Sequence, residues 1–123
     1  MKSTFGYFEK LDIRIGTVVK AQVPEWSHWV MRLEVDLGDE IGKRIVFAGL
    51  MKFYKPEDLV NKQYPFIVNI EPKKIGPKQK DGKYNFSQAL LLAATVEVKE
   101  KDYDEKPVLF TLSQKVDNGA KVK

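Results

Sequence analysis

The sequence predicts an all-β barrel, and three of its features lead to that fold class. Short apolar segments recur along the chain with turn-forming residues between them, which is the pattern of several short strands at regular spacing. In residues 31–37 apolar and polar side chains alternate strictly, so one face of that strand is expected to be buried and the other solvated. The chain has 123 residues and no cysteine, which suits a single domain, 1–123, whose core forms without disulfide bonds.

The first three expected strands follow one another closely. Residues 13–19 form the first strand, 31–37 the second and 44–48 the third. The turn at 38–43 contains two glycines and joins the second and third strands as a hairpin.

A short helix and a fourth strand come next. The helix is expected within residues 54–62, because Pro56 suits the first helical position and acidic residues follow it near the positive end of the helix dipole. Residues 64–70 form the fourth strand. Pro65 lacks an N–H group, so it predicts either a strand at the sheet edge or a position at the strand's start.

The rest of the chain is expected to complete the barrel and extend beyond it. Residues 71–86 form a basic loop, 88–98 the long last strand of the barrel, and 99–106 a charged loop. A further strand covers 108–112, and a turn at 117–119 precedes a basic tail. Five barrel strands with one short helix between the third and fourth are typical of the OB-fold, a five-stranded Greek-key barrel, here with a C-terminal extension.

Positive charge is concentrated in the middle of the chain. The net charge is +4, and residues 52–83 hold eight lysines and four acids, while the remaining thirteen basic and thirteen acidic residues balance. A local basic patch on a neutral body favours a phosphate-rich partner, although a solvated, lysine-rich loop would have the same composition. Lysine dominates the patch, which indicates electrostatic docking more than base-specific contacts.

Other classes of function lack the residues they need. The single histidine, His28, lies between Trp26 and Trp29, so neither a metal site nor a Ser-His-acid triad is expected. No glycine-rich phosphate loop follows a strand, and we expect no enzyme activity and no cofactor. Residues 89–96, the longest apolar run, are too short to cross a bilayer, and residues 1–10 lack the apolar run of a secretory signal. A cytoplasmic protein without membrane contact is therefore expected.

Four segments resemble the tRNA-binding-domain family. They read FEKLDIRIGTVV at 8–19, LEVDLG at 33–38, YKPEDLVNK at 54–62, and VNI, PKKIG and SQALLLAA within 68–94. The resemblance covers most of residues 8–122 in the same order. The family includes free-standing tRNA-binding proteins, domains appended to some methionyl-tRNA and phenylalanyl-tRNA synthetases, and the export-associated chaperone CsaA. The free-standing CsaA-like proteins look most similar.

The resemblance implies an OB-fold that binds tRNA or other structured RNA, usually as a homodimer. The RNA contacts that it implies are Asn69, Lys73, Lys74, Ser87, Gln88 and Leu90. Asn69 and Ser87 could bond phosphate or ribose. They could equally bond the protein's own backbone at the ends of strands.

Further lysines and aromatic residues around the basic segment extend this candidate set. Together with the two implied lysines, Lys52, Lys55 and Lys78 could bring flexible positive charge to a phosphate backbone, or could be solvated. Tyr84 and Phe86 flank the basic loop and could stack on bases, although Phe86 could also anchor the loop. Tyr54 is expected to pack the short helix onto the barrel.

Two apolar features could take part in contacts with other protein chains, one with unfolded polypeptides and one with a second copy of this chain. Trp26, Trp29 and Phe86 could receive unfolded chains, as the resemblance to CsaA-like chaperones suggests. The loop that carries both tryptophans is nevertheless expected to pack over the barrel mouth. Residues 4–11 carry apolar side chains that could pair across a two-fold axis in a homodimer, or pack on their own barrel.

Overall fold

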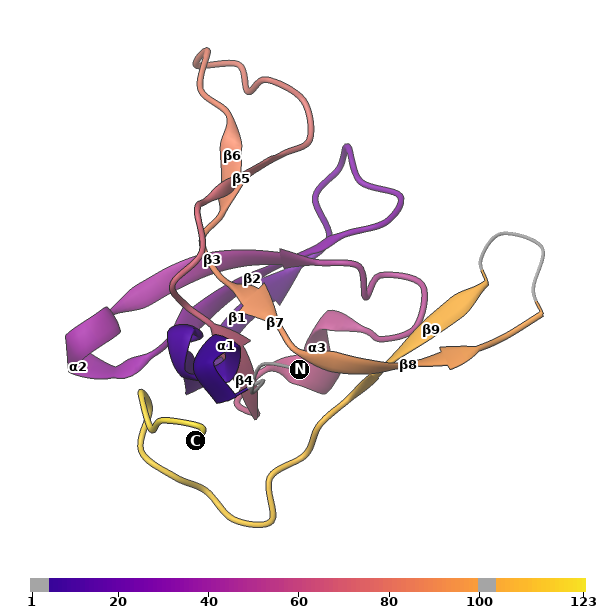
Figure 1. The fold of residues 1–123 in the computed structure, drawn as a ribbon. Coiled ribbons are helices and arrows are strands. Elements are labelled where there is room, and N and C mark those ends of the chain that lie inside the picture. Colours follow the sequence, from indigo (N-terminus) through magenta and orange to yellow (C-terminus); the bar gives the residue numbers. More distant parts are fainter. Residues whose placement is uncertain (1–4, 100–103) are drawn as a thin grey trace.

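A computed structural model describes residues 5–99 and 104–123 and confirms the all-β prediction (Figure 1). Its main element is a five-stranded antiparallel sheet with the order β3-β2-β1-β4-β7, which curls into a nearly closed barrel. Two further sheets have two strands each, β5 with β6 and β8 with β9. The strands are β1 (Ile13–Gln22), β2 (Met31–Asp36), β3 (Lys43–Ala48), β4 (Gln63–Ile67), β5 (Lys73–Ile75), β6 (Asn85–Ser87), β7 (Leu90–Leu91), β8 (Ala93–Glu97) and β9 (Glu105–Leu109). The helices are α1 (Phe5–Lys10), α2 (Gly38–Ile41) and α3 (Pro56–Leu59).

The barrel core is built on the alternation in β2. Met31, Leu33 and Val35 are fully buried, whereas the polar residues between them are partly exposed, as the sequence pattern predicts. Phe66 from β4 packs into the same cluster. Each of these side chains contributes about 1.5–3 kcal/mol by leaving water, so the first three strands and β4 hold the barrel together.

Helix α3 begins at the predicted residue and lies within the predicted segment, 54–62. Pro56 is its first residue, and the Asp58 carboxylate accepts the Lys55 N–H at 2.9 Å, which satisfies one of the free backbone donors at the helix start. The helix stops at Leu59 because the next residues bond to β1 instead. Asn61 donates its N–H to Val18 O at 2.8 Å and adopts a left-handed φ of 68°.

The expectation that Pro65 marks an edge strand, or a strand's start, is wrong. It is the third residue of β4, which lies between β1 and β7. Pro65 faces Ile15, but Ile15 exchanges its own hydrogen bonds with Gly119 and Ala120 on its other side. Because Ile15 directs its N–H and C=O away from β4, the residue opposite it needs no N–H group to bond β1. The Pro65 carbonyl instead accepts the Leu92 N–H at 3.1 Å.

The segment from 71 to 98 also differs from the sequence expectation. The predicted loop contains the hairpin β5–β6, which stands out from the barrel in Figure 1. The predicted long strand at 88–98 is broken: β7 pairs with β4, whereas β8 leaves the barrel and pairs with β9 in a separate ribbon. The further strand expected at 108–112 is β9, at 105–109. Of the charged loop expected at 99–106, residues 100–103 lie outside the described residues.

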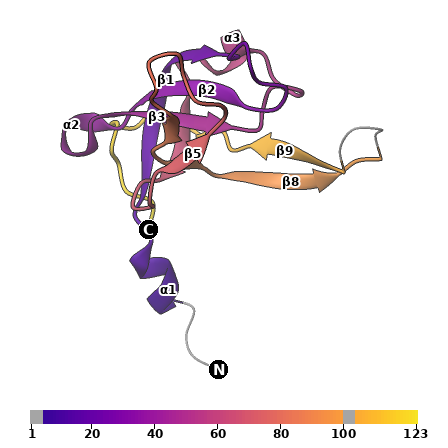
Figure 2. The same ribbon diagram turned by 90° about the horizontal axis from the view of Figure 1, so that it is seen from above.

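The C-terminal residues bond to the beginning of strand β1. The predicted turn at 117–119 is present, with Ala120 N–H bonded to Asp117 O and Gly119 at a φ of 92°. Residues 110–123, which follow β9, form a C-terminal arm. Its Val122 N–H donates to Ile13 O at 2.9 Å, so the end of the arm lies against β1. Helix α1 projects away from the barrel near this arm (Figure 2).

Candidate nucleic-acid interface

Residues 73–87, which we call the basic hairpin, present two different faces. Lys74 pairs with Phe86 across the two strands, and both side chains are exposed. The Lys74 ammonium lies 4.2 Å from the centre of the Tyr84 ring, within cation–π range. This outer face therefore combines positive charge with two exposed aromatic rings. Lys73 and Lys78, also exposed, add charge to the same hairpin.

The inner face of the basic hairpin turns toward the barrel. Ile75 and Asn85 pair there, and both are partly buried. Gly76 follows with a φ of 74° and lies against the Trp26 ring, where an added Cβ would stand 2.5 Å from the nearest ring atom. Trp26 in turn packs on Phe47 of β3, with ring centres 6.1 Å apart. This contact confirms that Trp26 packs back onto the barrel.

A cavity of about 550 Å³ lies between the inner face and strands β1 and β2. Its lining residues are Lys20, Gln22, Pro24, Trp26, Arg32, Glu34, Phe47, Gln79, Lys80 and Asn85. Three of them are basic and one is acidic, and Glu34 lies 3.3 Å from Arg32 and 3.9 Å from Lys20. OB-folds bind their ligands on this face, between the second and third strands and the loops beside them.

Sequence reasoning missed this cavity. Lys20 and Gln22 on β1, and Arg32 on β2, are the outward-pointing partners of the buried positions. The strict alternation in β2 could have shown which side chains leave the core, and therefore which polar groups line that surface. It could not show that Gln79 and Asn85 fold back over them.

Ser87 and Gln88 both bond to β3 and close the barrel there, although Ser87 is buried and Gln88 is exposed. Gln88 exchanges two hydrogen bonds with Ile45 of β3: its backbone N–H donates to Ile45 O, and its side-chain Oε1 accepts Ile45 N–H, both at 2.8 Å. Ser87 Oγ accepts Phe47 N–H at 2.9 Å and donates to Ala89 O at 3.1 Å. The backbone and side chain of Gln88 and the hydroxyl of Ser87 thus bond the edge of β3 that does not pair with β2.

We expect Ser87→Ala to act on stability first. The residue is 6% exposed, and its removal leaves the Phe47 N–H without its partner, which costs about 1–3 kcal/mol for a buried donor. Urea unfolding should show this loss. If the variant loses RNA affinity while its free energy of unfolding stays unchanged, the result would instead support the direct RNA contact that the family motif implies.

Asn69 also bonds the protein's own backbone. Its side-chain oxygen accepts Asp12 N–H at 2.8 Å, and its side-chain nitrogen donates to Lys10 O at 2.6 Å. The residue is exposed and joins the end of β4 to the segment between α1 and β1. Its strand-end role is therefore present, and its RNA contact stays a prediction.

The remaining candidates lie outside residues 73–87 of the basic hairpin. The ammonium of Lys52 lies 5.8 Å from the Trp29 ring centre, and Lys55 precedes α3. Leu90 lies exposed on β7. Trp29 is 51% exposed, whereas Trp26 is partly buried. Tyr54 contacts the core and donates its hydroxyl to Pro107 O at 3.0 Å, consistent with the expected packing role.

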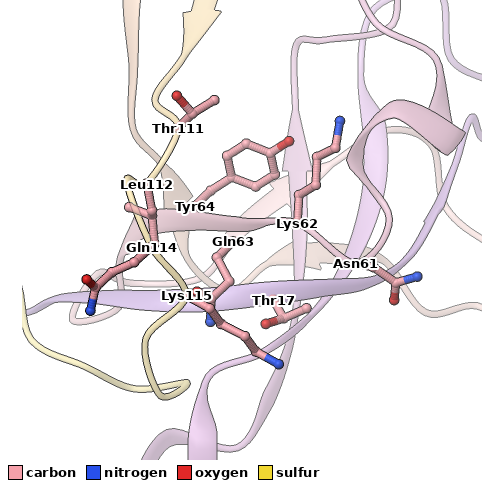
Figure 3. A pocket seen from close by; sticks show the side chains of 9 residues that line it. All are labelled: Thr17, Asn61, Lys62, Gln63, Tyr64, Thr111, Leu112, Gln114 and Lys115. Atoms are coloured by element: carbon pink, nitrogen blue, oxygen red, sulfur yellow. The ribbon is translucent and has the colours of Figure 1, made fainter.

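A second cavity, of about 540 Å³, lies between β4 and the C-terminal arm (Figure 3). Its floor is already hydrogen-bonded: Gln63 bonds Val116 through both side-chain groups, and Thr17 donates to Asn118 Oδ1 at 2.6 Å. Burial raises the pKa of Tyr64, which also lines it. None of the predicted RNA contacts lies here.

The described residues contain neither a metal-binding cluster nor a membrane-spanning helix. Over residues 5–99 and 104–123, no group of His, Cys, Asp or Glu side chains is arranged to hold a metal ion. Within the same residues, no helix has the length and apolar character needed to cross a membrane.

The fold and this surface define an OB-type binding domain with a basic, aromatic hairpin above a cationic cavity. The family model of the tRNA binding domain matches residues 13–121, and the chain belongs to that family.

Individual relatives agree with this assignment. The chain is 38% identical over 120 residues to the methionine–tRNA ligase of Pyrococcus furiosus, covering 98% of this chain and 14% of that enzyme. It thus spans about a seventh of that relative's length. Among solved structures, chaperone CsaA from Bacillus anthracis is similar over 100% of both chains, with a TM-score of 0.78 and 31% identity. The MetRS-related protein from Pyrococcus horikoshii has a TM-score of 0.77 and 27% identity, covering 100% of this chain and 99% of that one.

Proposed function

We propose that this chain binds tRNA or other structured RNA, without catalysing a reaction, through the basic hairpin and the adjoining barrel face. The observation that carries the proposal is the outer face of the hairpin. There Lys74 lies beside the exposed rings of Tyr84 and Phe86, with Lys73 and Lys78 close by in sequence. Membership of the tRNA-binding-domain family supports the same ligand.

The chemistry of this surface fits docking onto a phosphate backbone. Lysine ammonium groups are flexible point charges that accept phosphates without fixed geometry, and they displace condensed counterions. Exposed tyrosine and phenylalanine rings add stacking surfaces for unpaired bases. Structured RNA is recognised mainly by shape and backbone contacts, which suits a surface rich in lysine and poor in arginine.

Reversing two hairpin charges should weaken RNA binding strongly. We expect Lys73→Glu with Lys74→Glu to lower tRNA affinity at least about tenfold at low salt, and to reduce the log–log salt slope by about 2, one per lost phosphate contact. Both side chains are exposed, so the fold should be retained. Titration of bulk tRNA at two salt concentrations measures the effect, with unstructured single-stranded RNA as the reference ligand.

Lys62→Glu with Lys115→Glu is the matched control. It makes the same change in net charge on two exposed lysines that line the second cavity (Figure 3), a cavity that no residue of the basic hairpin lines. If both double variants lose affinity equally, or if tRNA and unstructured RNA bind equally weakly, the lysines supply only nonspecific attraction and the docking proposal is wrong.

A second candidate function is binding of unfolded polypeptide chains. Trp29, Phe86 and Leu90 are large apolar side chains with about half of their surface exposed. The similarity to chaperone CsaA from Bacillus anthracis favours this reading. Suppression of aggregation of a chemically denatured protein tests it. No suppression at one dimer equivalent of this protein would reject it.

We also propose that the protein acts as a homodimer in the cytoplasm. Helix α1 and the segment after it expose Tyr7, Phe8 and Leu11, and the β8–β9 ribbon and its end expose Val96 and Phe110. Both elements project from the barrel, so their apolar side chains lack cover within the described chain (Figures 1 and 2). Light scattering should give about twice the chain mass of 14.2 kDa, and a mass of one chain would reject the dimer.

A further inference from the structure

The cavity beneath the basic hairpin combines aromatic, amide and basic side chains. Trp26 and Phe47 supply aromatic surface, and amide side chains from two separate segments meet beside them. Basic side chains from β1, β2 and the hairpin turn surround the opening. Its volume of about 550 Å³ lies in the range of about 300–1,000 Å³ typical of small-ligand pockets.

The amide groups offer a hydrogen-bonding edge. Gln79 Nε2 donates to Asn85 Oδ1 at 3.1 Å. Over residues 5–99 and 104–123 neither side chain makes another hydrogen bond, so Gln79 Oε1 can accept and Asn85 Nδ2 can donate. An acceptor next to a donor complements the edge of a nucleobase, which presents the same groups once its pairing partner is absent.

The charges around the opening suit the chain on either side of such a base. Lys20, Arg32 and Lys80 outnumber the single acid, Glu34, whose carboxylate lies within reach of two of them. Phosphates that flank a base inside the cavity would therefore meet net positive charge. A base within a duplex could not enter, because its edge is paired and its faces are stacked.

We infer that this cavity receives one unpaired RNA base, which contacts Trp26 or Phe47 and bonds the Gln79–Asn85 pair. The inference rests on the proposed RNA binding and adds to it a selection for RNA with an unpaired nucleotide. The outer face of the hairpin contacts the RNA phosphate backbone, and the inner face binds a single base. Lysine docking alone would not distinguish a loop from a duplex.

Trp26 provides the readout. The chain has two tryptophans, so Trp29→Phe leaves Trp26 as the only tryptophan fluorophore. In this background we expect a stem-loop RNA with unpaired loop nucleotides to quench Trp26 fluorescence on binding. A blunt duplex with the same stem should bind through the lysines without quenching.

The amide pair is tested by affinity. Gln79→Ala with Asn85→Ala should weaken stem-loop binding about fivefold or more, the effect of losing base-edge hydrogen bonds, and leave duplex binding unchanged. Gln114→Ala, an exposed amide at the second cavity, is the control and should alter neither RNA. Equal duplex binding by the double variant and the parent protein also shows that the hairpin remains folded.

The outcomes separate this inference from the function on which it rests. If both RNAs bind and depend on Lys73 and Lys74, but Trp26 is not quenched and the amide variant binds normally, the base pocket is wrong and RNA docking stands. If neither RNA binds, both proposals fall. Quenching by the stem-loop alone, with selective loss in the amide variant, supports the pocket.

Discussion

Gly76→Ala is expected to lower the free energy of unfolding by about 3 kcal/mol, the sum of a left-handed backbone penalty and an overpacking penalty. Gly76 has a φ of 74°, and a Cβ there would stand 2.5–2.8 Å from three atoms of the Trp26 six-membered ring. The Trp26 ring cannot move freely, because it also packs against Phe47, with the two ring centres 6.1 Å apart. The hairpin and the tryptophan must therefore separate or strain.

Gly82→Ala is the matched control for the backbone penalty. Gly82 has a φ of 85°, but its nearest neighbour to an added Cβ is Lys78 Cε at 3.9 Å, which is ordinary contact. This variant should lose only about 1 kcal/mol, the cost of alanine in a left-handed conformation. Urea unfolding of both variants isolates the Trp26 contact as the difference. Equal losses would mean that Trp26 does not hold the hairpin.

The stability of this contact bears on RNA binding as well. Trp26 lies against both Gly76 of the basic hairpin and Phe47 of the barrel, so we expect it to hold the hairpin at the angle on which the lysines and the proposed base pocket depend. Gly76→Ala should therefore weaken RNA binding, whereas Gly82→Ala should change it little. A folded Gly76→Ala protein with normal affinity would show that the hairpin docks independently of the barrel.

The sequence predicted those parts of the fold that depend on local patterns. Strict alternation located β2, and its apolar residues are the buried ones. Pro56 located the start of α3, because proline fits the first helical position. The turn at Gly119 was predicted from turn-forming residues alone.

Other parts depend on contacts between distant segments, and the sequence did not predict them. The strands of the basic hairpin are three residues long, and glycine, proline and lysine between them mask the pattern. For Ser87 the sequence allows a bond to RNA or to the protein's own backbone, but it does not identify the backbone partner, Phe47, which lies forty residues away. Pro65 could occupy an inner strand because Ile15 bonds the C-terminal arm instead.

The candidate site shows the same division. The hairpin lysines were found because charge density is a property of the local sequence. The cavity beneath them takes its lining from β1, β2, β3 and the hairpin, so no single segment carries a signal for it. Lys52 and Lys55 are close to the hairpin lysines in sequence, yet the structure places them on the segment leading into α3.

The second large effect is expected at Arg14, which joins three parts of the chain. The residue is 4% exposed, and its guanidinium bonds Asp12 at 2.7 Å, Glu40 at 3.1 Å and Gly119 O at 3.1 Å. These bonds, first to Glu40 and then to Asp12, raise the pKa of Arg14 further above its ordinary value, so it stays charged. It links the start of β1, helix α2 and the C-terminal arm.

Arg14→Met should lower the free energy of unfolding by about 2 kcal/mol. Removing one partner of a fully buried ion pair costs about 3–5 kcal/mol. Here the carboxylates of Asp12 and Glu40 are 32% and 74% exposed, so water can solvate them after the change and the loss is smaller. Hydrogen exchange should be faster at Ile15 and Val122, whose N–H groups bond across to the arm and β1. A loss below about 0.5 kcal/mol would show that the bonds of Arg14 contribute little to the stability of the fold.

The dependence of the free energy of unfolding on acidic pH gives an independent check of the Arg14–Glu40 ion pair. Hydrogen bonding from Arg14 holds the pKa of Glu40 below its ordinary value. Because folding lowers this pKa, Glu40 stabilises the protein above its unfolded pKa of about 4.3, and the contribution is lost as pH falls through the lower folded value.

The difference in unfolding free energy between the wild type and Glu40→Gln should therefore be constant near neutral pH and shrink in acid. In the Arg14→Met background the same substitution should have no pH-dependent effect, because the group that lowers the pKa is gone. A difference that persists in that background would mean that another cation, such as Lys121, holds Glu40 instead.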